Sequence, residues 1–444
     1  MPRRDVLRFA AAAGTFIGVG QIPARLARAA FVGGMPRTEA FDVVVIGTGM
    51  AGLTAAREAA EQGARVAVLE KQPRPLFGGN SLLAGGIFCM PMADTPEARQ
   101  AFVDEIMKKS GYRTDKALTE DLANRVLGDI DWLVAHGVEL TDPAPQAPYK
   151  VHARTCKPAM YKGMPKALGT LMAAAEGNGV HFYFSTKASE LLVDAAGRVV
   201  GVRALTSKGF VDFRARATII ATGGFAGNRQ MLEQWVGPTA DEGVVRGVKW
   251  ATGDGHRMAS EVGALLIHMG GTETVHVAAT HPKNPASANP FAVLPYTLGI
   301  NKLGRRYVDE SLGYVAHGKA VMNQPGAQAA LVFDQGVADM NEGRAVLELF
   351  ASLGIEVLKA PTLEELAAKI EVPADALRET VEAFNAAVSN GQALDPDGTP
   401  IKGLYAAGEC VGGYYLDDYV GGASLSRCLV DGRVAGRNAA AERA

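Results

Sequence analysis

Three glycines and a glutamate near the start of the chain are spaced to hold a ligand that carries phosphates. Gly47, Gly49 and Gly52 fall in the motif GTGMAG. In such a motif the first glycine lets the chain reverse, the second admits a pyrophosphate to the backbone, and the third brings a helix against a strand. Glu70 follows 18 residues after Gly52, near the ~20 at which an acid binds the ribose of a dinucleotide. NAD and FAD both use this arrangement, and a tightly packed glycine turn without a ligand is the alternative.

The elements around this motif place it at the edge of a parallel sheet. Residues 41–46 form an apolar, β-branched run typical of a strand buried on both faces, and residues 53–62 have helical spacing. A second strand is expected over residues 65–69, directly before Glu70. The start of the helix then faces the phosphates, because the free backbone N–H groups there attract anions. The sequence therefore predicts an α/β, Rossmann-like domain, a parallel sheet with helices on both faces.

Composition and charge exclude several other classes of protein. The 45 Lys and Arg residues nearly balance 47 Asp and Glu residues, and the formal net charge of -2 leaves no global field that would gather nucleic acid. With 48% hydrophobic and 21% charged residues, the chain is typical of a folded globular protein. The four cysteines are scattered without a C-x-x-C pair, so we predict no metal site and read them as buried free thiols.

The N-terminus resembles a twin-arginine export signal over residues 1–30. Arg3 and Arg4 precede an apolar, alanine-rich run at 9–22, and small residues follow at 27–29. The run is shorter than the ~20 residues of a spanning helix, and no later run reaches that length, so we expect no integral membrane segment. The expectation is a periplasmic or otherwise exported protein that folds around its cofactor before transport. An uncleaved amphipathic tail is the alternative.

Four phrases, met in a fixed order, point to a known family. They are GTGMAG with Glu70, GGNS at 78–81 with AGG at 84–86, ATGGF at 221–225, and GLYAAGE at 403–409. Together they resemble the flavoprotein family of succinate dehydrogenase, fumarate reductase and 3-ketosteroid dehydrogenase, which binds FAD, and the resemblance runs from residue 41 to residue 437. The phrases TGDGHRMA at 252–259 and GRRYVDE at 304–310 are similar to the tricarballylate dehydrogenase branch.

The resemblance implies a set of cofactor-binding residues. Those expected to contact FAD are Gly47, Gly49, Met50, Ala51, Gly52, Glu70, Lys71, Gly79, Asn80, Ser81, Gly85, Gly86, Ala188, Ala221, Thr222, Gly223, Asp254, Gly408, Glu409, Gly422, Ser424 and Leu425. Backbone amides near Ser424 and Leu425, at the start of the last helix, would stabilise negative charge on the reduced flavin. The GGNS loop contains no histidine, the residue with which membrane-complex members attach FAD, so we expect non-covalent FAD.

Two tyrosines stand where fumarate reductases carry arginines. By resemblance, Tyr314 takes the place of the arginine that delivers a proton and Tyr419 that of an arginine that clamps the substrate. Ketosteroid dehydrogenases carry tyrosine at both places. A phenol with a pKa near ~10 can polarise a carbonyl as a donor, or remove a proton as phenolate. We therefore expect Tyr419 and Tyr314 to be catalytic, with Tyr415 and Tyr296 as further possibilities; packed tyrosines with satisfied hydroxyls are the alternative.

Two histidines are the other residues that could meet a substrate. His281 and His276 could bind an anionic group, although the family phrase H-x-P-T is only echoed by His281-Pro282. The family strand with H-x-x-G-G is missing, because Asn390 runs within thirteen residues to Gly403. A surface position or a satisfied buried position is the alternative for each histidine.

The chain divides into an FAD-binding domain and one insertion. From residue 264 to about 360 the α/β alternation is lost, and proline, asparagine and histidine become frequent. We predict an inserted α+β capping domain at 264–360, between a first part of the FAD-binding domain at 41–263 and a second part at 361–444.

These inferences combine into one predicted reaction. We expect an FAD-dependent dehydrogenase that forms a C=C bond next to a carbonyl or carboxylate of a small molecule. A tyrosine removes the proton, hydride passes to the flavin, and electrons leave to a separate acceptor such as a quinone or a cytochrome. The alternatives are an ene reductase, like fumarate reductase, that runs in the opposite direction, and a flavin-binding electron-transfer module without small-molecule catalysis.

Overall fold

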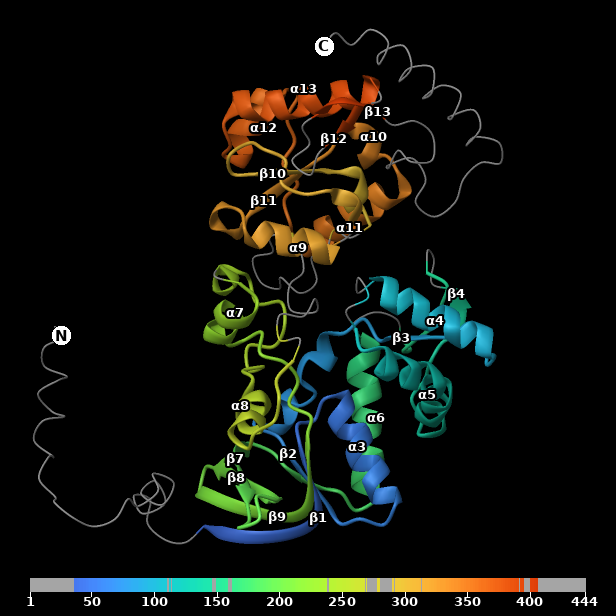
Figure 1. Cartoon of the computed structure of the whole chain (residues 1–444), viewed down its shortest axis with the longest axis vertical. Helices are drawn as coiled ribbons and strands as arrows, with labels where there is room; N and C mark the ends of the chain where they lie inside the picture. The colour runs from blue at the N-terminus through green and yellow to red at the C-terminus, as the bar shows by residue number, and fades with distance from the viewer. Residues whose placement is uncertain are drawn as a thin grey trace, which may run out of the picture.

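The computed structural model describes most of the chain between residues 36 and 405. The described residues are 36–405 without 110–111, 113, 146–148, 159–161, 238, 268, 270–277, 280–289, 291, 313, 391 and 395–399. Figure 1 shows a lower unit built around a sheet and an upper unit that holds helices α9–α13. The predicted export signal and everything from residue 406 onward lie outside the described residues.

A six-stranded sheet forms the base of the lower unit. Its strand order is β6 (His181–Tyr183), β2 (Val66–Leu69), β1 (Arg37–Ile46), β9 (Gly209–Ile220), β8 (Val199–Thr206) and β7 (Lys187–Val193). Strand β1 pairs in parallel with β2 and with β9, so that Val45 lies opposite Val68 on one side and Ile219 on the other. Strands β7, β8 and β9 pair antiparallel. The predicted α/β fold with a parallel sheet is confirmed.

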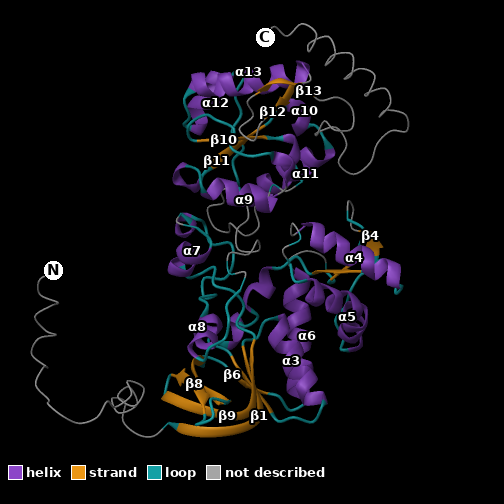
Figure 2. Cartoon of the chain, viewed as in Figure 1, coloured by secondary structure: helices purple, strands orange, loops and turns teal. Residues whose placement is uncertain are grey.

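Alternate residues of the central strands bury against different layers. Val44 of β1 belongs to an apolar cluster with Met258 of helix α8 (Asp254–Glu261). The next residue, Val45, packs in a cluster with Ala56 of α3 (Met50–Glu61) and Ala175 of α6 (Gly163–Gly177). Successive side chains of a strand point to opposite faces, so the run of apolar residues in β1 is explained by helices on both faces (Figure 2).

A small layer of two helices and a three-stranded sheet lies beyond α3 and α6 in the lower unit. It contains α4 (Pro96–Lys109), α5 (Lys116–Ala135) and a three-stranded sheet of β3 (Ile87–Met90), β5 (His152–Thr155) and β4 (Ala144–Pro145). Leu133 and Ile130 of α5 pack with Leu168 of α6 and Leu53 of α3, which joins this layer to the sheet.

The upper unit is α+β. Strands β10 (Leu298–Asn301) and β11 (Ala329–Val332) pair antiparallel. The helices are α9 (Tyr314–Met322), α10 (Gln335–Ala338), α11 (Asn341–Leu353), α12 (Leu363–Ile370) and α13 (Ala374–Asn390). Leu298 and Ile300 of β10 pack on Ala367 of α12 and Leu377 of α13. Helices after residue 360 therefore belong to the packing of the upper unit, and the division at 360 stays a prediction.

The two units meet near helix α7 (Arg229–Trp235). Met322, the last residue of α9, packs in the apolar cluster of Leu232 from α7, and its carbonyl accepts a hydrogen bond from the Thr239 hydroxyl. Strands β12 (Gln392–Leu394) and β13 (Pro400–Tyr405) form a separate antiparallel pair after α13. Within the described ranges, no helix combines the length and the apolar character needed to cross a bilayer.

Candidate cofactor and active site

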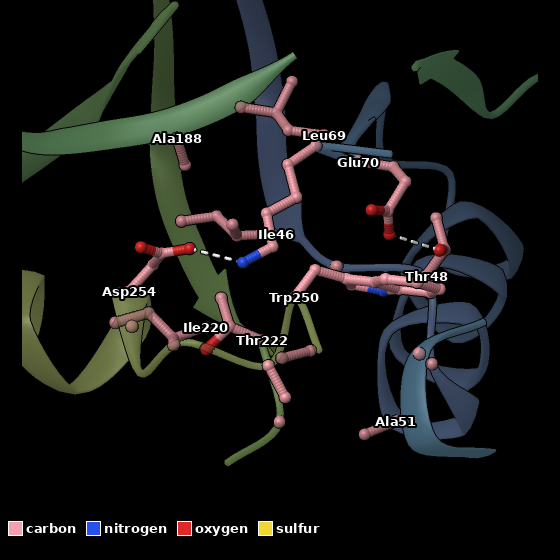
Figure 3. Close-up of a pocket in the computed structure, with 18 of the residues that line it drawn as sticks. Ile46, Thr48, Ala51, Leu69, Glu70, Ala188, Ile220, Thr222, Trp250 and Asp254 are labelled. Atoms are coloured by element: carbon pink, nitrogen blue, oxygen red, sulfur yellow. Dashed lines mark hydrogen bonds and ion pairs between the residues drawn. The ribbon is translucent and has the colours of Figure 1, made fainter. Parts of the chain in front are cut away.

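A cavity of about 460 Å³ opens at the edge of the sheet where the parallel strands end. It lies at the carboxyl ends of β1, β2 and β9, the edge at which open α/β sheets bind ligands. Figure 3 shows side chains from these strand ends surrounding it. The lining residues come from the segments 46–51, 69–71, 78–81, 186–188 and 220–223, and from positions between 248 and 266.

The glycine turn is built for close backbone approach. Gly47 has φ +108°, and a Cβ placed on it would lie 2.4 Å from the carbonyl oxygen of Ala221. A Cβ on Gly52 would lie 2.0 Å from the carbonyl oxygen of Gly47. Helix α3 begins directly after Gly49, without an acidic residue in its first turn. The N–H groups in the first turn of a helix have no partner within the helix, so this end of α3 suits an anionic phosphate.

Thr48 and Glu70 form a buried polar pair at the floor of the cavity. The Thr48 hydroxyl donates to Oε2 of Glu70 at 2.5 Å and accepts from the backbone N–H of Gly78 at 3.0 Å. The other carboxylate oxygen accepts from the backbone N–H of Gln72 at 2.8 Å. A carboxylate has about four lone-pair sites, so Glu70 keeps capacity to accept hydroxyl groups of a ribose.

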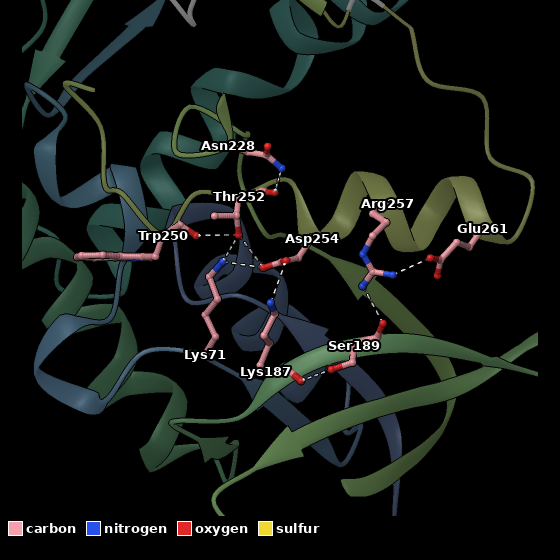
Figure 4. Close-up of polar contacts among 9 residues, drawn as sticks. All are labelled: Lys71, Lys187, Ser189, Asn228, Trp250, Thr252, Asp254, Arg257 and Glu261. Carbon is pink, nitrogen blue, oxygen red and sulfur yellow. Dashed lines mark hydrogen bonds and ion pairs between the residues drawn. The ribbon is translucent and has the colours of Figure 1, made fainter. Parts of the chain in front are cut away.

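A second polar network joins three segments at the opposite wall (Figure 4). Nζ of Lys71 lies 2.6 Å from Oδ2 of Asp254 and donates to the Thr252 hydroxyl at 2.9 Å. Nζ of Lys187 lies 3.4 Å from Oδ1 of the same aspartate. Burial acts to raise the pKa of Asp254, but the hydrogen bond and charge of Lys71 hold it below its usual value. Asp254 is therefore a carboxylate at neutral pH, and it ties α8 to the ends of β2 and β7.

The GGNS loop is also fixed from both sides. The Ser81 hydroxyl accepts from the backbone N–H of Met50 at 3.1 Å, which holds the loop to the start of α3. Oδ1 of Asn80 accepts from the backbone N–H of Val248 at 2.7 Å. The loop thus lies between the glycine turn and the segment that leads into α8.

Most of the predicted FAD residues that the structure describes lie together. Seventeen of them fall in the described ranges, and fourteen line the cavity: Gly47, Gly49, Met50, Ala51, Glu70, Lys71, Gly79, Asn80, Ser81, Ala188, Ala221, Thr222, Gly223 and Asp254. Gly52, Gly85 and Gly86 are not among the lining residues. Gly86 packs beside Cys156. The backbone N–H of Cys156 donates a hydrogen bond to the carbonyl oxygen of Gly86 at 2.9 Å. Gly408, Glu409, Gly422, Ser424 and Leu425 lie outside the described residues.

The predicted catalytic residues are less well defined. Tyr314 is the first residue of α9 and is 38% exposed. Among the described residues, those that line the cavity do not include Tyr314 or Tyr296, which ends a short 3-10 helix at Leu294–Tyr296. Figure 1 shows α9 on the edge of the upper unit that is turned toward α7. Tyr415, Tyr419, His276 and His281 lie outside the described residues.

Four further residues belong to the site. Trp250 and Lys187, which no motif indicated, line the cavity, and so does His256. Thr252 accepts a hydrogen bond from Lys71. His256 and Thr252 lie in the TGDGHRMA phrase, from which we expected no role for them. A buried pair in the upper unit was also unexpected: the Tyr307 hydroxyl is hydrogen-bonded to Nε2 of His317. Burial raises the pKa of Tyr307, with a contribution from the nearby Glu310 charge, and burial lowers the pKa of His317.

An ion pair next to this tyrosine fixes the start of α9. Arg306 donates three hydrogen bonds to the Glu310 carboxylate, at 2.6, 3.1 and 3.2 Å, and the Gly299 N–H donates to the same carboxylate at 2.7 Å. Both charged side chains are buried. The segment that leads into Tyr314 is therefore held by β10.

A close-packed glycine turn, a helix start and a ribose-type acid at one sheet edge are the features of a dinucleotide-binding α/β protein. The chain belongs to the FAD binding domain family, whose model matches residues 42–393. The cradle that a Cβ on Gly47 would fill, and the free acceptor capacity of Glu70, fit FAD in this cavity. Among the described residues there is no cluster of three or more metal-ligating side chains.

Relatives with named activities agree with this family. The chain is 28% identical over 454 residues to a fumarate reductase (cytochrome) of Shewanella frigidimarina, covering 90% of this chain and 77% of that protein. It is 29% identical over 456 residues to a urocanate reductase of Eggerthella lenta, covering 90% and 74%. A 3-ketosteroid-delta4-(5alpha)-dehydrogenase structure from Rhodococcus jostii matches with a TM-score of 0.61 and 26% identity, covering 91% and 99%.

The family fixes the general activity. The protein is an FAD-dependent oxidoreductase that acts on CH–CH groups, and it belongs with the fumarate reductase and ketosteroid dehydrogenase flavoproteins. The predicted family and the predicted FAD are confirmed, as is the fold with an FAD-binding domain and a capping domain.

Glu70 offers a direct test of the cofactor geometry. Glu70→Gln keeps the side-chain volume but removes the negative charge of the carboxylate, whose oxygens accept hydrogen bonds from the ribose hydroxyls. We expect FAD binding to weaken by the ~1.5–3 kcal/mol of a charged hydrogen bond, roughly 10- to 150-fold in Kd. Equilibrium dialysis of the apoprotein against FAD measures it, with Glu58→Gln on the exposed face of α3 as the control. Unchanged affinity in Glu70→Gln would remove Glu70 from the site.

Proposed function

We propose that the protein is an exported dehydrogenase that oxidises a small ketone or carboxylate to its α,β-unsaturated product. The residue that carries this proposal is Tyr314, the first residue of α9, which by resemblance stands where the family's reductases have an arginine. The matched ketosteroid dehydrogenase, 99% of whose chain is covered by the match, supports the same class of substrate. Bound FAD would supply the acceptor for the hydride, which carries both electrons removed from the substrate.

The chain's own residues then divide the work. We propose that Tyr419 donates a hydrogen bond to the substrate carbonyl and that Tyr314 takes the proton from the neighbouring carbon. Hydride leaves the adjacent carbon, so one C–H bond on each carbon is broken as the C=C bond forms. Tyr415 and His281 complete the proposed substrate site. Gly408, Glu409, Gly422, Ser424 and Leu425, together with Gly52, Gly85 and Gly86, complete the proposed FAD site.

An ene reductase is the second proposal, because the relatives from Shewanella frigidimarina and Eggerthella lenta are both named reductases. The same parts would then deliver hydride and a proton to a C=C bond. In either direction a separate electron partner, a quinone or a cytochrome, exchanges electrons with the flavin. A silent flavin-binding electron-transfer module is the remaining alternative.

Anaerobic mixing with flavin absorbance as the readout separates these proposals. Oxidised holoprotein is mixed with 3-ketosteroids, cyclic ketones and tricarboxylates, and dithionite-reduced holoprotein with fumarate and urocanate. Bleaching of the oxidised flavin by a saturated compound would support the dehydrogenase. Reoxidation only by unsaturated acids would overturn it in favour of the reductase, and no response in either arm would favour the electron-transfer module.

Non-covalent attachment of FAD is a further part of the proposal. In the GGNS loop Asn80 and Ser81 are the polar side chains, and their oxygens accept backbone hydrogen bonds. We expect mild denaturation of the purified protein to release FAD without proteolysis, measured by chromatography of the supernatant. Flavin that stays on the denatured chain, or FMN in place of FAD, would contradict this.

Export is tested independently of catalysis. We propose a twin-arginine signal at residues 1–30, which would carry the protein out of the cytoplasm already folded. Changing Arg3 and Arg4 to lysine should trap the precursor in the cytoplasm with FAD bound, as measured by fractionation and flavin content. An Arg8→Lys variant serves as the control. Continued export of the double variant would leave these residues as an ordinary signal or a tail.

A further inference from the structure

The segment at residues 247–253, here called the strap, forms one wall of the cofactor cavity. In space it extends from Asn80 of the GGNS loop to the start of α8. Hydrogen bonds hold it along its length. Its hydrogen bonds are Val248 N–H to Asn80 Oδ1 at 2.7 Å, Gly227 N–H to Ala251 O at 2.8 Å, Asn228 Nδ2 to Thr252 O at 3.1 Å, Lys71 Nζ to Thr252 Oγ1 at 2.9 Å and Gly253 N–H to Gly224 O at 3.2 Å.

Close packing prevents the strap from moving away from the cavity. A Cβ on Gly227 would lie 2.1 Å from the carbonyl oxygen of Lys249, and a Cβ on Gly247 would lie 2.7 Å from Oδ1 of Asn80. The backbone on both sides of Trp250 is therefore fixed before any ligand arrives. A side chain on such a segment is pre-organised, so it loses little freedom on binding.

Trp250 is the large aromatic side chain of the strap, and it lines the cavity. In Figure 3 its ring extends toward Thr48, on the side of the cavity where Glu70 is drawn, and Trp250, Thr48 and Glu70 all line the same cavity. Glu70 is the acid spaced for the ribose, and the glycine turn next to Thr48 is the place of the pyrophosphate. The ring thus lies beside the place expected for the adenosine half of the cofactor.

We propose that Trp250 is a cofactor-contacting residue whose ring stacks on the adenosine half of bound FAD. Stacking of a base on an aromatic side chain is a substantial source of affinity in nucleotide sites and does not need hydrogen bonds. The inference rests on FAD binding alone. Its failure would leave the proposed direction and substrate of the reaction unaffected, since those are tested by flavin bleaching.

The test measures ADP and FAD binding to the deflavinated protein. Trp250→Ala should weaken both ligands about 10- to 100-fold, while riboflavin binding, which involves no adenosine, should change less than twofold. Calorimetry gives the affinities, and the melting temperature of the apoprotein shows whether the fold is kept. Trp235→Ala on α7, which is 38% exposed and does not line the cavity, is the matched control and should bind both nucleotides as the wild type does.

Fluorescence provides a second measurement that needs no alanine variant. ADP does not absorb where tryptophan emits, so a change in emission on adding ADP reports contact with the ring. We expect this change in the wild type and in Trp235→Phe, and its loss in Trp250→Phe. ADP and FAD affinities of Trp250→Ala within twofold of wild type, or tighter binding by that variant, would overturn the proposal, as would an emission change that survives in Trp250→Phe.

Discussion

A Tyr314→Phe enzyme should reduce its flavin about 10²–10⁴-fold more slowly than the wild type, the loss typical of a missing proton-transfer group. Tyr419→Phe should cost roughly 10²–10³-fold, as expected for one lost donor to a developing oxyanion. Both variants should keep FAD and its visible spectrum, because phenylalanine retains the ring. Anaerobic stopped-flow reduction by the substrate that bleaches the wild-type flavin measures each effect.

The double variant tests whether the two tyrosines act on one transition state. If they do, its loss should be smaller than the product of the two single losses. Tyr112→Phe, at a position 73% exposed between α4 and α5, should reduce its flavin at the wild-type rate. An unaltered rate of flavin reduction in Tyr419→Phe would contradict the tyrosine proposal. It would favour a site in which His281 binds a carboxylate of the substrate.

Gly52→Val should yield a folded protein that retains no FAD through purification, with affinity lowered by roughly 10³-fold or more. A Cβ at this position would lie 2.0 Å from the Gly47 carbonyl oxygen, so the start of α3 must move away from the turn. Gly47 cannot follow, because its N–H donates to the Leu69 carbonyl at 2.8 Å. The displaced N–H groups then miss the pyrophosphate, and each charge-assisted hydrogen bond lost costs about 1.5–3 kcal/mol.

A glycine elsewhere provides the matched control for this variant. Gly128 lies within α5, and a Cβ on it would meet nothing within 4 Å. Gly128→Val should therefore keep FAD and melt close to the wild type, since valine is no worse than glycine in a helix interior. Flavin content per chain, read from the visible spectrum after gel filtration, measures both. A yellow Gly52→Val protein with normal FAD content would contradict the geometry of the turn.

The part of the site that the sequence predicted best is the part formed by neighbours in the chain. Gly47, Gly49 and Glu70 belong to one strand–helix–strand unit, where spacing along the chain determines position in space. Trp250 had no such signal, and Thr252 lies in the TGDGHRMA phrase without an expected role. Their strap is fixed by Asn80 and Lys71, which are 168 and 181 residues away from the groups that they bond. Spacing patterns contain no information about contacts at that separation.

The fold shows the same division between local and distant information. Helix α12 begins at a local signal, because the Thr362 hydroxyl caps it by accepting from the Glu365 N–H. The packing of α12 and α13 on β10 has no such local signal, because an apolar helix face fits many apolar surfaces. Likewise the stretch at 180–193 forms two strands, separated at Ser185 with φ +51°, so that β6 pairs with β2 and β7 with β8.

The wide sequence span of the cavity wall has a consequence for biosynthesis. Its lining runs from Ile46 to Leu266, a span of about 220 residues. At the ~5–20 residues per second of translation, roughly 10–45 s separate the first wall of the cavity from the last as the chain leaves the ribosome. A nascent chain shorter than residue 266 lacks part of the cavity that would hold FAD. FAD therefore binds completely only late in synthesis. An exported form of the protein would have to stay in the cytoplasm until FAD has bound.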